Sequence, residues 1–149
     1  MRELARCASG GSRVQDRTLP RIAIVEDDEV LTFLFREVCR SAGYEVAWQS
    51  TCVSDALAKL ARDEPDVLLL DFALDGVRDG LEVLAVTSRR YPALTTVLAT
   101  GWDFEKLAAR IDYVAADRLM QKPILPSALS AILASIADER QAQTLARAA

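Results

Sequence analysis

The feature that most constrains the fold is the run Val67-Leu-Leu-Leu-Asp71, which is apolar for four residues and ends on a carboxylate. Consecutive apolar residues predict a strand buried on both faces, as in parallel sheets covered by helices. In an open sheet of this kind, ligands bind in the crevice beyond the carboxyl ends of the strands. Asp71 is therefore expected at the mouth of such a crevice, although an aspartate there can also simply cap the following turn.

Strands and helices are predicted to alternate along the chain. The other predicted strands cover residues 22–25, 45–48, 95–99 and 118–121. The predicted helices run from about Val30 to Gly43, over 55–62, from about 81 to 90, weakly over 103–111, and from Pro126 onward. In the second of these helices, Ser54 is the predicted N-cap, and Leu57, Leu60 and Ala61 are predicted to face inward. Residues 75–80 are predicted to form a turn-rich loop. This alternation indicates an α/β fold, a doubly wound five-stranded parallel sheet with helices on both faces.

Composition and charge divide the chain into three parts. Residues 1–20 are predicted to be a disordered basic leader, residues 21–137 a single domain, and residues 138–149 a helical extension or tail. Residues 1–21 contain five arginines and two acids, which gives them a charge of +3. The positive and negative charges of residues 138–149 cancel. Because the net charge of the chain is −4, the remaining body carries −7. An acidic body is a poor nucleic-acid surface. Without a long apolar segment or a signal peptide, a cytoplasmic protein is expected.

The chain contains no histidine and three cysteines, none of them in a C-x-x-C pair. The absence of histidine excludes Ser-His-Asp and Cys-His catalysis and histidine-based zinc sites. A metal ion would have to be held by oxygen atoms, which favours Mg²⁺, Mn²⁺ or Ca²⁺.

Polar residues follow four of the five predicted strands. They are Glu26 and Asp27, Asp71, Thr100 and Lys122. Two carboxylates about 4 Å apart repel by on the order of 4 kcal/mol at an effective dielectric constant near 20, so such a cluster raises a pKa or binds a cation. Mg²⁺ is the expected cation for a cluster of oxygen ligands. Lys122 can place a positive charge beside a phosphoryl oxygen, and the Thr100 hydroxyl can donate a hydrogen bond to another. This set predicts phosphoryl transfer to a carboxylate nucleophile.

The motifs carrying these residues resemble those of the receiver domain of bacterial two-component response regulators, of the stand-alone, single-domain type. They are Ile24-Val-Glu-Asp-Asp28, Leu68-Leu-Leu-Asp71, Asp79-Gly-Leu-Glu-Val83, Ala99-Thr-Gly101 and Gln121-Lys-Pro123. The resemblance spans about residues 21–137 and implies the flavodoxin-like strand order 2-1-3-4-5.

The resemblance also implies a role for each site residue. Asp71 resembles the phosphoacceptor, Thr100 the switch hydroxyl, and Lys122 the lysine that contacts the phosphoryl group. The implied ligands of Mg²⁺ (or Mn²⁺) are Glu26, Asp27, Asp71 and the backbone carbonyl of Ala73. Pro123 is expected to follow a cis peptide bond.

Three positions depart from the common family pattern. Leu119 stands where the family often has an aromatic residue, Ala73 offers no side chain to the site, and the loop after Asp71 lacks a proline. Trp102, two residues after Thr100, lies where family members vary their phosphorylation and dephosphorylation rates. Leu119 and Trp102 are therefore possible modulators, with partial core packing as the alternative for Trp102.

These observations predict a receiver that accepts a phosphoryl group on Asp71 and changes its partner-binding surface. The expected partner is a sensor histidine kinase or a histidine phosphotransfer protein; no DNA-binding domain and no membrane contact are expected, and the chain would be a monomer or a phosphorylation-dependent dimer. One alternative is a phosphorylation-independent interaction module. A haloacid dehalogenase-type phosphatase is disfavoured because Ala73 stands where that chemistry needs a second aspartate, and an FMN protein because the first loop is acidic.

Overall fold

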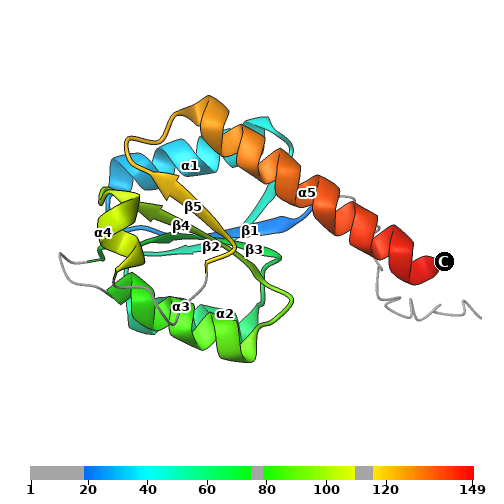
Figure 1. Cartoon of the computed structure of the whole chain (residues 1–149), viewed down its shortest axis with the longest axis horizontal. Helices are drawn as coiled ribbons and strands as arrows, with labels where there is room; N and C mark the ends of the chain where they lie inside the picture. Colours follow the sequence, from blue (N-terminus) through cyan, green and yellow to red (C-terminus); the bar gives the residue numbers. More distant parts are fainter. Residues whose placement is uncertain (1–18, 75–78, 110–115) are drawn as a thin grey trace, which may run out of the picture.

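The computed structural model describes residues 19–74, 79–109 and 116–149, and a five-stranded parallel sheet forms its middle layer (Figure 1). The strands are β1 (Arg21–Val25), β2 (Glu45–Ser50), β3 (Val67–Asp71), β4 (Thr95–Thr100) and β5 (Arg118–Gln121). They lie in the order β2-β1-β3-β4-β5, and each neighbouring pair is parallel. The predicted fold class and strand order are therefore confirmed.

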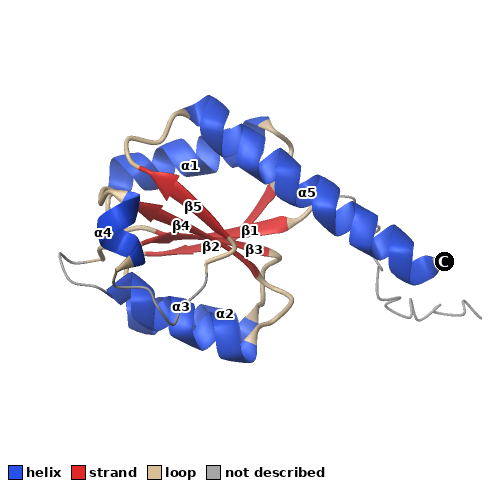
Figure 2. Cartoon of the chain, in the orientation of Figure 1, coloured by secondary structure: helices blue, strands red, loops and turns tan. Residues whose placement is uncertain are grey.

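Helices cover both faces of the sheet (Figure 2). They are α1 (Glu29–Ser41), α2 (Val53–Arg62), α3 (Asp79–Arg90), α4 (Phe104–Ala108) and α5 (Pro126–Ala148). Figure 2 shows α1 and α5 on one face and α2 and α3 on the other, with α4 short and set at the margin. This is the three-layer arrangement expected when strands and helices alternate.

The strand β3 lies at the centre of the sheet and is buried along its whole length. Because successive side chains of a strand point to opposite faces, Val67 and Leu69 pack with α1 and α5, whereas Leu68 and Leu70 pack with α2 and α3. The continuous apolar run is thus explained, since both faces of β3 are covered.

The helix α1 begins and ends at residues suited to those positions. The side chain of Asp28 accepts hydrogen bonds from the backbone N–H groups of Val30 and Leu31, so it is the N-cap. At the other end, Gly43 has φ of 86°, which is the left-handed conformation that glycine favours after a helix. The predicted end of this helix at Gly43 is confirmed.

Several local predictions were wrong. The N-cap of α2 is Cys52, and Ser54 lies inside the helix, because α2 begins at Val53. Ala61 is exposed, while Ala56 is the buried small residue of that helix. The helix α3 begins at Asp79, two residues before its predicted start.

Parts of three predicted segments lie outside the residues that the structure describes. Of the predicted leader, residues 1–18 lie outside the described residues, as do residues 110 and 111 of the weak helix and residues 75–78 of the predicted loop. The helix α5 runs without interruption to Ala148, and its last part projects beyond the sheet (Figure 1). No helix in the described ranges is both long and apolar enough to span a membrane.

Candidate functional site

The polar residues predicted at the strand ends do meet at one edge of the sheet. Glu26 directly follows β1, Asp71 and Thr100 are the last residues of β3 and β4, and Lys122 directly follows β5. The parallel register places Asp71 beside Ala99 and Thr100 beside Gln121, so the strands end at similar heights.

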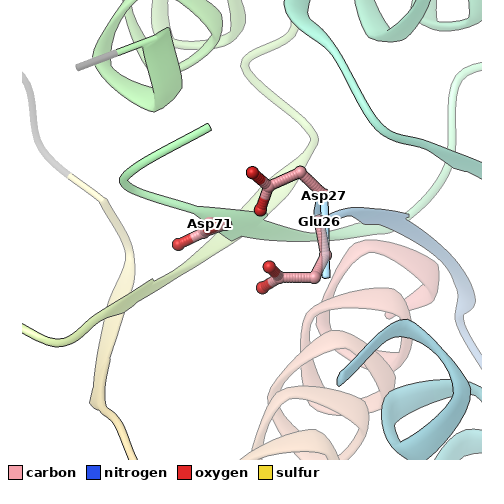
Figure 3. A group of neighbouring side chains, drawn as sticks. All are labelled: Glu26, Asp27 and Asp71. Carbon is pink, nitrogen blue, oxygen red and sulfur yellow. The ribbon is translucent and has the colours of Figure 1, made fainter. Parts of the chain in front are cut away.

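Three carboxylates form the centre of this site (Figure 3). One oxygen from each of Glu26, Asp27 and Asp71 lies within 4.8 Å of the other two. Glu26 and Asp71 are buried, with 1% and 4% of their surface exposed, whereas Asp27 is exposed. Figure 3 shows Glu26 and Asp27 on the chain that leaves β1, and Asp71 on the neighbouring strand β3. The cluster therefore has two buried acids, Glu26 and Asp71, and one exposed acid at its rim, Asp27.

The local structure gives different positions to the four consecutive acids at residues 26–29. The backbone N–H of Glu26 donates to the carbonyl of Ser50 at 3.0 Å, which continues the sheet for one residue and directs Glu26 inward. Asp28 turns outward and caps α1. Glu29 lies in the first turn of α1, where its negative charge interacts favourably with the positive end of the helix dipole. Two acids therefore serve the helix and two serve the site.

Lys122 connects the two buried carboxylates. Its Nζ donates to Asp71 Oδ1 at 3.1 Å and to Glu26 Oε2 at 3.2 Å. Its backbone N–H donates to the carbonyl of Thr100 at 2.7 Å, which fixes the start of the loop after β5. The Lys122–Pro123 peptide bond is cis, in agreement with the expectation.

Burial and repulsion shift the ionisation of the site. Burial, together with the nearby charge of Asp71, raises the pKa of Glu26 to about 7, and Lys122 opposes this effect only in part. For Lys122, burial lowers the pKa, but Glu26 and Asp71 outweigh burial and raise the pKa above its ordinary value. The site is thus under electrostatic strain that an added cation would relieve.

The side chain of Thr100 is buried and lies at the end of β4, and its Oγ1 accepts a hydrogen bond from the backbone N–H of Trp102 at 3.0 Å. The ring of Trp102 packs against the ring of Phe72 with 5.3 Å between centroids. Phe72 directly follows Asp71, so this aromatic pair joins the segment after β3 to the segment after β4. Phe72 is not among the predicted site residues, although the sequence shows an aromatic residue directly after Asp71.

Two further predicted residues lie at the margin of the site. The backbone N–H of Ala73 donates to Asp71 Oδ1 at 3.3 Å, so Ala73 is next to the carboxylate although its side chain is exposed. Leu119 is 42% exposed and pairs with Leu98 in the sheet, two residues before Thr100. Leu119 is thus on an exposed surface near the site and contributes no polar atom to it.

The donor set fits a hard divalent cation. Its side-chain donors are all carboxylate oxygens, which Mg²⁺ and Mn²⁺ prefer, and Lys122 offsets only one of the three negative charges. The open rim at Asp27 leaves access for water ligands and for an incoming anion.

Comparisons with known proteins identify the family of this chain. A family model described as the response regulator receiver domain matches residues 22–134. The chain is 32% identical over 126 residues to the nitrogen assimilation regulatory protein NtrX of Azorhizobium caulinodans. The aligned residues cover 83% of this chain and 26% of NtrX. It is 22% identical to the chemotaxis protein CheY of Thermotoga maritima, over 72% of this chain and 88% of CheY. The chain thus spans about a quarter of NtrX and most of CheY.

Solved structures agree with the sequence comparisons. The CheY-like receiver domain protein of Methanospirillum hungatei superposes with a TM-score of 0.73 at 25% identity, covering 84% of this chain and 98% of the other. The receiver domain of a LuxO repressor protein from Vibrio parahaemolyticus has a TM-score of 0.75 at 23% identity, covering 86% and 97%. The similarity to the LuxO receiver domain, at 23% identity, shows that the two chains have the same fold.

Proposed function

Because the chain belongs to the receiver domain family of response regulators, whose members accept phosphoryl groups in two-component signalling, we propose that Asp71 is its phosphoacceptor. The donor is a phosphohistidine of a sensor histidine kinase or of a histidine phosphotransfer protein, since the chain has no histidine of its own. The observation that carries the proposal is the buried Asp71 carboxylate, with Lys122 Nζ at 3.1 Å and two further acids around it.

Each residue of the site has a separate task in this reaction. A carboxylate oxygen of Asp71 attacks the phosphorus atom, the bond between phosphorus and the histidine nitrogen breaks, and the imidazole leaves with the bonding electrons. Lys122 neutralises charge on the transferred group, and the Thr100 hydroxyl donates a hydrogen bond to one of its oxygens. Thr100 is the last residue of β4, which neighbours β3, and Lys122 directly follows β5, the next strand of the sheet.

The residues that would hold Mg²⁺ or Mn²⁺ are Glu26, Asp27, Asp71 and the backbone carbonyl of Ala73. The ion would supply positive charge to the oxygens of the transferring phosphoryl group. This assignment is supported by the grouping of the carboxylates of Glu26, Asp27 and Asp71, whose oxygens lie within 4.8 Å of one another.

The acceptor is tested by labelling with radioactive acetyl phosphate or a phosphorylated kinase in the presence of Mg²⁺. The wild-type chain should incorporate label, and Asp71→Asn should incorporate none, because an amide oxygen is a far weaker nucleophile than a carboxylate. Asp138→Asn, on the exposed part of α5, is the matched control and should label normally. Equal labelling of Asp71→Asn and wild type would contradict the proposal.

Binding of beryllofluoride separates this function from a phosphorylation-independent interaction module. Trp102 lies against Phe72, next to the acceptor, so its fluorescence should change when Mg²⁺ and beryllofluoride bind. Trp48 donates its indole N–H to the Asp63 carbonyl, and a Trp48→Phe background removes its signal. Absence of binding at millimolar ligand would favour the interaction module.

A further inference from the structure

We propose that Gly80 is a positioning residue for the phosphoacceptor: it lets the first turn of α3 lie directly against the backbone of Asp71 and Phe72 and so fixes the end of β3. This inference rests on the proposed function and extends it to a residue that has no functional group of its own. Gly80 acts through Asp71 and Ala73, and it touches no reacting atom.

The contact leaves no space for a side chain. A methyl group placed on Gly80 would lie 2.3 Å from the carbonyl oxygen of Asp71 and 2.8 Å from both Cα and the carbonyl oxygen of Phe72. All three neighbours are backbone atoms, so no side chain can rotate away to make room. Any larger residue must therefore move either α3 or the end of β3.

The segment from Asp71 to Ala73 is held on two sides. The backbone N–H of Phe72 donates to the Ala99 carbonyl of β4 at 2.9 Å, and the Phe72 carbonyl accepts from the N–H of Gly80 at 3.2 Å. The Phe72 ring is buried between the sheet and Trp102. Because Gly80 and the segment are joined by the hydrogen bond to the Phe72 carbonyl, an added methyl group would disturb both the start of α3 and the backbone that carries the Asp71 carboxylate and the Ala73 carbonyl.

Helix stability alone does not explain a glycine here. Glycine in a helix is less favourable than alanine by about 1 kcal/mol, so the position is better suited to alanine unless the space is needed. The other glycine near the site, Gly101, has no atom within 4 Å of where a methyl group would lie. Among these two residues, only Gly80 is required by close contact with the acceptor strand.

The test compares Gly80→Ala with Gly101→Ala. The dissociation constant for Mg²⁺ is measured by Trp102 fluorescence in the Trp48→Phe background and by calorimetry. Gly80→Ala should weaken Mg²⁺ binding about 10–100-fold, as expected when a residue supporting metal ligands is altered. Its labelling by acetyl phosphate should slow by at least about tenfold, since small misplacements of reacting groups are costly. Gly101→Ala should match wild type in both.

A control for simple loss of stability uses Leu84→Ala. Leu84 is fully buried on α3 and shares an apolar cluster with Ala56 and Leu60 of α2, so its truncation lowers the stability of the domain without adding an atom beside Asp71. At a temperature where circular dichroism shows all variants folded, Leu84→Ala should keep the wild-type Mg²⁺ affinity. Gly80→Ala with wild-type Mg²⁺ affinity, or an equal loss in Leu84→Ala, would overturn the proposal.

If Gly80→Ala does not fold, the wild-type amide resonances decide the question. The amide resonance of Gly80 should shift on Mg²⁺ binding together with that of Ala73, because the N–H of Gly80 donates to the carbonyl of Phe72, the residue before Ala73. A shift of Ala73 without one of Gly80 would refute the inference. Labelling of wild type tests the phosphoacceptor assignment separately, so the Mg²⁺ comparison stands even where no label is taken up.

Discussion

Lys122 shows how a single residue can hold two buried acids together. Its ammonium group bonds to both Glu26 and Asp71, whose own repulsion contributes to the raised pKa of Glu26. Without Lys122, these carboxylates would lose their cationic partner in the buried part of the site. The lysine is therefore structural in the resting site as well as a contact for the transferred group.

Substitution of Lys122 by alanine should reduce the free energy of unfolding by about 1.5–3 kcal/mol, the usual range for hydrogen bonds to charged groups. Urea denaturation without divalent ions measures this loss. Mg²⁺ should restore stability in part, because it replaces the missing positive charge. The control is Lys59→Ala, which removes a partly exposed ion pair with Asp55, and its loss should be smaller and independent of Mg²⁺. Equal losses in both variants would contradict this role of Lys122.

At the scale of elements, one arginine anchors α5 to the base of the sheet. Arg140 Nη1 donates to the carbonyls of Asp66 and Ala93 and to Thr95 Oγ1, and Nη2 donates to Asp66 Oδ1. Beyond this residue, all side chains of α5 are exposed. Arg140 thus marks the point where the helix leaves the domain.

Arg140→Ala should lower the free energy of unfolding by about 1–2 kcal/mol, because four hydrogen bonds are lost at a partly exposed site. Amide hydrogen exchange should become faster in the last turns of α5. Arg147→Ala serves as the matched control, since Arg147 has no ion pair with the residues that the structure describes, and it should change neither quantity. Unaltered exchange in Arg140→Ala would show that the helix is held by its apolar contacts alone.

At the scale of the whole molecule, the sheet brings acids from distant parts of the chain to one edge, and their mutual repulsion opposes folding. A divalent cation that binds only the folded chain should therefore stabilise the entire domain. At 100 times its dissociation constant, Mg²⁺ should add about 2.7 kcal/mol to the free energy of unfolding. Thermal unfolding with and without Mg²⁺ measures this gain.

Asp27→Asn should remove most of that gain, because Asp27 is a candidate ligand at the open rim of the site. Sodium chloride at equal ionic strength controls for screening of surface charges. A gain that persists undiminished in Asp27→Asn would place the stabilising ion elsewhere.

The sequence by itself determined the fold class, the five strands and the identity of the polar residues at their ends. Apolar runs such as 67–70 specify buried strands without help from the rest of the chain, and parallel strands must deliver their ends to one edge. Only the tertiary structure decided which acids serve the site and which cap α1, where α2 begins, and that Gly80 lies against Asp71. These features depend on contacts between residues far apart in the chain, such as Glu26 with Ser50 and Lys122, which local patterns do not encode.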